Sequence, residues 1–194
     1  ILITVAAINA LIGGIIGINQ IHLRSLLAYS SIGHIGWIIS MLSINKIYPC
    51  IIYFITYSIV VIPVFFIIRS SNSKSIKRIY NSFKVRITKR IILIVSILSL
   101  AGVPPLTGFI PKLIVIFRVI NSKFFILLIP LIIGSYINLY YYLNIALNIL
   151  IISSISTNKV KRERTLRSVF IIATSRLGIF PLLILYALIT INKS

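Results

Sequence analysis

The chain has almost no carboxylate, because aspartate is absent and Glu163 is its only glutamate. It also has a single cysteine, Cys50, and its only histidines are His22 and His34. One cysteine excludes an internal disulfide, and this inventory assembles no cluster of metal ligands. Bond-making catalysis needs a general base with an orienting partner, and no such pair is spaced for it. We therefore expect no cofactor, no metal and no redox chemistry of the chain's own.

Apolar residues dominate what remains. They make up 59% of the 194 residues, and the mean hydropathy is +1.10. A soluble domain cannot hide that much apolar surface in one core. A membrane span needs about 20 helical residues, and the apolar runs predict about six spans: 3–18, 27–44, 48–68, 91–122, 124–152 and 168–191. The fold class we expect is all-α, a polytopic membrane helix bundle that forms a single membrane domain over residues 1–194.

The formal net charge of +19 raises the question of nucleic-acid binding, because basic patches bind phosphate. Most of the basic residues instead gather in alternate loops, chiefly 69–90 and 154–167, and Arg24 marks a third. The intervening turns carry few, such as Lys46 and Lys123. This is the positive-inside pattern, and it sets which loops share a side of the membrane. We expect the basic loops to meet anionic membrane lipids, with cardiolipin as a candidate, and no nucleic acid.

Segment 91–122 is too long for one straight span, and the motif LSLAGVPPLTGFIPK interrupts it at residues 98–112. Prolines remove backbone donors and clash with the preceding turn, and glycines tolerate unusual dihedral angles. We therefore predict two half-helices joined by an irregular piece. Irregular backbone at membrane depth persists only where it is buried in protein or lines a wet cavity, so the break marks a working site. Its residues are Gly102, Pro104, Pro105, Gly108 and Pro111.

Lys112 lies at the end of this motif, about 16 Å of helix before Lys123 at the predicted end of the span. It is therefore near mid-depth, too deep to reach the interface easily by snorkelling. A charged lysine is costly there, so such a residue can take up and release a proton. The alternative is a lysine that snorkels or pairs with a carboxylate elsewhere. His34 is a second candidate for a proton relay, although a lone helix histidine is more often a hydrogen-bonded packing residue.

Two further patterns concern the predicted spans. Gly13, Gly14 and Gly17 share a helix face in the first span, and small residues let neighbouring helices approach closely, so we expect a packing role. Tyr53 and Tyr57 lie in the third span. They either line water or belong to an interfacial aromatic belt, and the sequence leaves both interpretations open.

A family resemblance rests on the break motif together with Gly17–Trp37, GINQIHLRSLLAYSSIGHIGW, and Tyr136–Tyr142, YINLYYY, in the same order. These motifs resemble the subunit 2 family of NADH dehydrogenase, the mitochondrially encoded antiporter-like membrane subunits of respiratory complex I. The likeness covers most of the chain, although residues 150–194 match only in hydropathy. It implies the mitochondrial inner membrane, basic loops on the matrix side, and other complex I membrane subunits as partners. It also implies proton translocation, as a non-redox subunit of H⁺-translocating NADH:ubiquinone reductase.

The family is built from two inverted repeats of five helices, each around a broken helix. The resemblance makes residues 3–152 the second repeat and 168–191 the closing C-terminal helix. Lys112 matches the lysine that the family places in its central hydrophilic axis. The facing helix contributes a polar, channel-lining set: Tyr29, Ser30, Ser31 and His34.

The chain departs from the family in one large respect. The family's first repeat carries a membrane-embedded glutamate and further lysines, in motifs resembling GLE, KxGxAPFHFW and WQK, and none of these occurs here. We expect a split subunit whose first repeat is a separate chain, and a fragment of a longer protein is the alternative. Other interpretations also stay open at this point: a structural membrane subunit without its own channel, and an Mrp-type cation/proton antiporter subunit.

Overall fold

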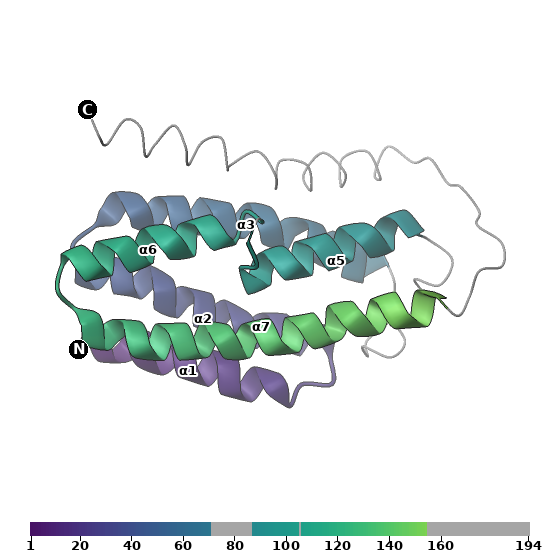
Figure 1. Cartoon of the computed structure of the whole chain (residues 1–194), viewed down its shortest axis with the longest axis horizontal. Helices are drawn as coiled ribbons and strands as arrows, with labels where there is room; N and C mark the ends of the chain where they lie inside the picture. The colour runs from purple at the N-terminus through teal and green to yellow at the C-terminus, as the bar shows by residue number, and fades with distance from the viewer. Residues whose placement is uncertain (71–86, 105, 155–194) are drawn as a thin grey trace.

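The structure, a computed structural model, describes residues 1–70, 87–104 and 106–154 (Figure 1). Within these ranges the regular secondary structure is entirely α-helical, which confirms the predicted fold class. The helices are α1 (Leu2–Ile18), α2 (Leu23–Ser43), α3 (Ile47–Ser70), α5 (Ile87–Ala101), α6 (Phe109–Asn121) and α7 (Phe125–Ser154). The expected closing helix at 168–191, the loop at 154–167 and most of the loop at 69–90 lie outside the described residues.

In the described part of the chain, α2, α3 and α7 are each long and apolar enough to cross a membrane. Helix α1 and the part of α5 from Arg90 are shorter apolar helices. Helices α5 and α6 lie end to end in Figure 1 and together run alongside α3. The predicted discontinuous helix is therefore present as two half-helices that replace one span.

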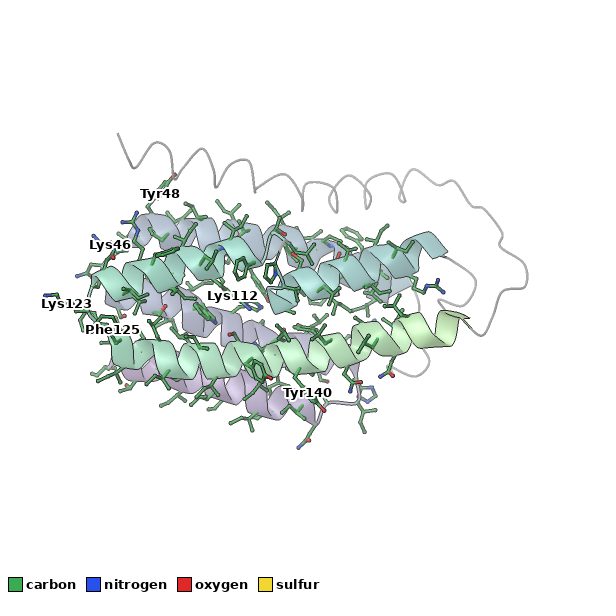
Figure 2. The ribbon with its side chains drawn as sticks, in the orientation of Figure 1. Lys46, Tyr48, Lys112, Lys123, Phe125 and Tyr140 are labelled. Atoms are coloured by element: carbon green, nitrogen blue, oxygen red, sulfur yellow. The ribbon has the colours of Figure 1, made fainter. Side chains whose placement is uncertain are left out.

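Each described helix runs back along the one before it, except at the break between α5 and α6. Lys46, after α2, and Lys123, after α6, consequently lie at the same end of the bundle (Figure 2). The turn that holds Asn19 and Gln20, between α1 and α2, lies at the other end. Lys112 lies between the two ends (Figure 2). This arrangement agrees with the alternation of loops on which the predicted topology rests.

Helix α1 packs closely against α2 and α7 because glycines remove side chains at the crossings. A Cβ added to Gly13 would lie 2.5 Å from the backbone nitrogen of Gly33, too close for any side chain. A Cβ on Gly134 of α7 would collide with the Ala10 carbonyl oxygen of α1. Such close backbone approach stabilises helix pairs through van der Waals packing where lipid removes the hydrophobic driving force.

Buried polar residues lie between two apolar clusters. Along α2 the order is Leu26 and Leu27 in one cluster, then Ser30 and His34, then Trp37 in the other cluster. Along α7 the second apolar cluster comes first, then the buried polar position, then the first apolar cluster. The first cluster joins α2, α3, α5 and α7 and includes Leu23, Leu26, Leu27, Val64, Ile67, Leu93, Ile97 and Ile149. The second joins α1, α2, α3, α6 and α7 and includes Ala6, Ala10, Trp37, Met41, Val115, Val119 and Leu131. The polar layer is thus sealed by apolar side chains on both sides.

Candidate functional site

Helix α5 ends in a glycine turn of the kind that closes many helices. Gly102 has φ of +83°, a left-handed conformation that side-chain-bearing residues rarely adopt. Its N–H donates to the Ser99 carbonyl (3.0 Å), and the Val103 N–H donates to the Leu98 carbonyl (3.3 Å). These are the two bonds of a Schellman motif, which satisfies carbonyls that the helix end would leave without partners. The break therefore begins at Gly102 because only glycine reverses the chain there without strain.

Helix α6 begins against the last turn of α5. The Gly108 N–H donates to Ser99 Oγ (3.1 Å), and Ser99 Oγ also lies 2.7 Å from Thr107 Oγ1. A Cβ on Gly108 would collide with the Ser99 carbonyl oxygen, so this approach requires a glycine. Ser99 and Thr107 are buried. One serine hydroxyl on α5 therefore binds the residues that immediately precede α6.

Lys112 lies in the first turn of α6 and is only 6% exposed. Its Nζ donates a hydrogen bond of 2.8 Å to the carbonyl oxygen of Ala101, the last residue of α5. The end of a helix carries partial negative charge on such carbonyls, so this position suits an ammonium group. A Cβ on Gly102 would lie 2.8 Å from Nζ, so the missing side chain also makes room for the lysine. Residues 1–154 contain no Asp or Glu, so no carboxylate of this segment competes for the amine.

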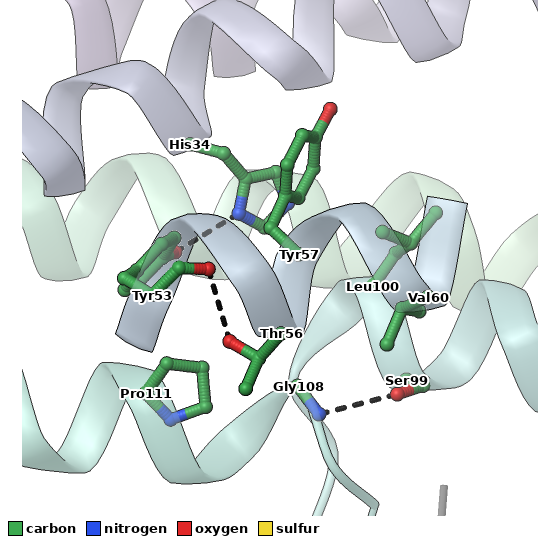
Figure 3. Close-up of a pocket in the computed structure, with 9 residues that line it drawn as sticks. All are labelled: His34, Tyr53, Thr56, Tyr57, Val60, Ser99, Leu100, Gly108 and Pro111. Atoms are coloured by element: carbon green, nitrogen blue, oxygen red, sulfur yellow. Dashed lines mark hydrogen bonds between the residues drawn. The ribbon is translucent and has the colours of Figure 1, made fainter. Parts of the chain in front are cut away.

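His34 projects from α2 into the same region and is 5% exposed. Its Nδ1 lies 2.9 Å from Tyr53 Oη, and its ring lies against that of Tyr57 with centroids 4.7 Å apart (Figure 3). Its Nε2 is buried and has no hydrogen-bond partner among the described residues. The histidine thus has one nitrogen fixed by a tyrosine and one free to exchange a proton.

A small cavity lies beside His34 at the break (Figure 3). Its volume for the centre of a water molecule is about 10 Å³, which is room for about one water. Polar side chains on its wall include Thr56, Tyr57 and Ser99. The full lining is His34, Tyr53, Thr56, Tyr57, Val60, Ser99, Leu100, Gly108 and Pro111. The cavity therefore joins the histidine to the backbone break without opening a wide pore.

The residues of α2 that the sequence predicts to line a channel make different kinds of contact. Ser30 is buried and accepts a hydrogen bond of 2.5 Å from Tyr142 Oη of α7. Ser31 is half-buried, and its hydroxyl donates to the Ala28 carbonyl (2.6 Å). Tyr29 is half-buried, and its backbone carbonyl faces α1. Among these residues and His34, only the histidine lines the cavity.

The sequence-predicted break residues lie where the helix is interrupted, with differing exposure. Gly102 and Pro111 are buried and Gly108 is half-buried, whereas Pro104 is exposed. Pro105 lies outside the described residues. Gly102 and Gly108 therefore have specific steric roles.

For other site residues the sequence left the role open or gave no signal. Tyr53 and Tyr57 line the cavity, and Tyr53 is only 1% exposed. This places them at the site and not in an aromatic belt. Their spacing with Thr56 puts all three on neighbouring turns of one helix face, a signal that was present in the sequence. Ser99 gave no such signal, because its partners lie beyond the break.

Comparison with known proteins gives a consistent family assignment. The sequence pattern described as "NADH:quinone oxidoreductase/Mrp antiporter, TM" matches residues 1–138. NADH-ubiquinone oxidoreductase chain 2 of Lumbricus terrestris is 41% identical over 191 residues, covering 95% of this chain and 55% of the relative. The protein of the same name from Locusta migratoria is 34% identical over 167 residues, covering 82% and 48%. The chain thus spans about half the length of the curated relatives it matches.

Solved structures show the same fold. A chain of respiratory complex I from Thermus thermophilus, solved with bound Aureothin, superposes with a TM-score of 0.79 at 22% identity, covering 93% of this chain and 42% of that one. A chain of the Mrp complex from Dietzia sp. DQ12-45-1b gives a TM-score of 0.57 at 19% identity, covering 84% and 30%. Both likenesses concern the fold alone, and the one to the complex I chain is the closer of the two.

Proposed function

The chain belongs to the NADH:quinone oxidoreductase/Mrp antiporter membrane family, and from that premise we propose that it is a proton-translocating membrane-arm subunit of NADH:ubiquinone oxidoreductase. It is a multi-pass protein of the mitochondrial inner membrane. Relatives that share 30% identity or more carry the name of that oxidoreductase, which favours complex I over a free-standing Mrp-type antiporter. The chain takes no part in electron transfer itself in this proposal.

The observation that carries the proposal is the position of Lys112. Its amine is buried midway along the bundle, at a helix break, and is bonded to a backbone carbonyl. The preceding residue, Pro111, lines the cavity beside His34. A residue held by a carbonyl can change protonation state without leaving a carboxylate unpaired. In the proposed relay, the Lys112 ammonium releases a proton toward the cavity and the unpartnered His34 Nε2 accepts it. Reprotonation of the lysine from the opposite side resets the site.

The apolar clusters on either side of the polar layer serve this function by limiting leakage. A proton path that stayed wet on both sides would let protons flow back and lose the coupling. The space beside His34 has room for only about one water, which in this proposal limits proton conduction. We propose that charge moving elsewhere in the complex biases Lys112 electrostatically, since charges interact strongly across a desolvated interior. Electron transfer would thereby drive proton movement at a distance.

The test is Lys112→Met, which fills a similar volume with an apolar side chain. Coupled NADH:ubiquinone turnover should fall, while native gels show a fully assembled complex. Lys46→Met is the matched control, because Lys46 is exposed at the end of α2 and lies outside the polar layer. Unchanged turnover in the assembled Lys112→Met complex would favour the alternative of a structural subunit without its own channel. Purification of the chain free of complex I would favour the Mrp-type alternative.

We further propose that residues 3–152 form the second inverted repeat and that the first inverted repeat of the family packs against α1. Ile8, Ile12 and Ile15 of α1 are exposed large apolar side chains on a helix otherwise packed against α2 and α7. The chain spans about half of its relatives' length, so those relatives hold further residues that such a face can contact. A photo-crosslinker at Ile12 should attach to a protein segment that carries an intramembrane glutamate. Capture of lipid alone would count against this partner.

A further inference from the structure

The buried hydroxyl of Ser99 has a use that the proton relay itself does not require. It lies on the last turn of α5, two residues before Ala101, whose carbonyl binds Lys112. It bonds Thr107 Oγ1 at 2.7 Å and the Gly108 N–H at 3.1 Å, immediately before α6 begins. The same two half-helices are therefore joined twice, once by the Lys112 amine and once by this group of Ser99, Thr107 and Gly108, which we term the hydroxyl clasp.

The two connections differ in how they respond to protons. The lysine bond changes whenever the amine gains or loses a proton or turns to another partner. Serine and threonine hydroxyls stay neutral throughout the physiological pH range, so the clasp persists in every state of the lysine. Ser99 is 4% exposed and Thr107 is 7% exposed, so bulk water does not compete for these bonds. The clasp therefore keeps the distance between α5 and α6 fixed while Lys112 works.

We propose that Ser99 is the positioning residue of the break, acting through Thr107 and Gly108 to hold Lys112 opposite the Ala101 carbonyl. This inference rests on the proposed proton relay and assigns to Ser99 a role distinct from that of the lysine. Ser99 also lines the cavity beside His34, so loss of the clasp would alter the space next to that histidine. The Schellman turn at Gly102 fixes the end of α5 but makes no bond to α6. The clasp is thus the neutral connection across the break.

The experiment uses variants of the complete complex. Thr107→Val keeps the side-chain shape and deletes the hydroxyl, whereas Thr107→Ser keeps the hydroxyl and deletes a methyl group. Ser99→Ala removes the hydroxyl that takes part in both clasp bonds. Ser96→Ala is the matched control, because Ser96 is a buried serine one turn earlier on α5 and outside the clasp. Each variant is measured for assembly, for coupled turnover across pH, and for protons moved per electron.

Thr107→Val should lower coupled turnover about fivefold at the wild-type optimum, the factor that one ordinary hydrogen bond is worth. Ser99→Ala, which removes both clasp bonds, should lower it at least as much. The pH profile should shift by about 0.7 unit, the logarithm of that factor. Thr107→Ser and Ser96→Ala should retain wild-type values. The double variant of Ser99→Ala with Thr107→Val should be no worse than Ser99→Ala alone, because both act on one connection.

Two results would overturn the assignment of Ser99. One is that assembled Thr107→Val has the wild-type pH profile and proton yield while Lys112→Met is impaired. That result would agree with the relay and refute the positioning role of the clasp. The other is equal damage from Ser96→Ala, which indicates general loss of packing in α5. If Ser99→Ala does not assemble, the comparison of Thr107→Val with Thr107→Ser still decides the matter. Failure of the relay itself would be recognised separately, by normal pumping in Lys112→Met.

Discussion

Lys112 Nζ lies 2.8 Å from the Ala101 carbonyl oxygen, so a lysine in the first turn of α6 is bonded to the last residue of α5. The two half-helices act on that amine in opposite directions. The start of α6 disfavours a positive charge, whereas the end of α5 favours it. Burial adds a further cost to the charged form. A modest change of charge nearby can therefore tip the balance, which is the property that a driven relay requires.

Gly102→Ala should damage the site more than it damages the bundle. The left-handed φ of +83° costs an alanine about 1–2 kcal/mol, and its Cβ would lie 2.8 Å from Lys112 Nζ. We expect coupled turnover to fall more steeply than the yield of assembled complex on native gels. Gly33→Ala is the control, because the nearest atom to its Cβ would be the movable amide nitrogen of Asn138 at 3.0 Å, with the Ala10 carbonyl oxygen at an ordinary 4.0 Å. Equal turnover in the two variants would refute this role of Gly102.

Gly13→Ala should prevent assembly. The new methyl group would lie 2.5 Å from the backbone nitrogen of Gly33, and neither backbone can move aside without separating α1 from α2. Overpacking of this kind costs about 3 kcal/mol. Gly17→Ala is the comparison, because its methyl group would face the Tyr141 ring at 3.0 Å, a contact that a small ring shift relieves. The amounts of assembled complex from the two variants, measured on native gels, should differ clearly, and similar amounts would contradict the packing described for α1.

The bond from Tyr53 Oη to His34 Nδ1 gives a prediction for the relay. Tyr53→Phe leaves both imidazole nitrogens without a described partner and should cost about 1 kcal/mol of stability. Coupled turnover should fall as the ring loses its fixed orientation, though less than in Lys112→Met. Coupled turnover should fall further in His34→Phe, which keeps a ring and removes both nitrogens, than in Tyr53→Phe. A normal rate of coupled turnover in His34→Phe would mean that the histidine has a packing role and no part in the relay.

Topology can be measured at exposed described positions. In a chain with Cys50 replaced by alanine, Lys46→Cys and Lys123→Cys should react with an impermeant thiol reagent added from the intermembrane side. Both lie at one end of the bundle (Figure 2), away from the side that the basic loops predict to be the matrix. Arg24→Cys should react only after the inner membrane is opened. The reverse pattern of labelling would invert the topology.

The sequence predicted the fold and the location of the break, because hydropathy and the clustered glycines and prolines act locally. It did not predict the partner of Lys112. A backbone carbonyl becomes a partner only once Gly102 ends α5 at Ala101 and turns the chain back. Ser99 was missed for a related reason, since its bonds cross an irregular loop with no periodic signal. Tyr53 could be assigned to its site only when the packing of α3 against α2 was known.

The central claim is that Lys112 carries protons, and the most direct test counts them. Complex I with Lys112→Met is reconstituted into proteoliposomes, and protons moved per electron are measured beside wild type and the Lys123→Met control. We predict a lower proton yield per electron for Lys112→Met and a wild-type yield for the control, whose lysine is exposed at the end of α6. An unchanged yield in a fully assembled Lys112→Met complex would contradict the account.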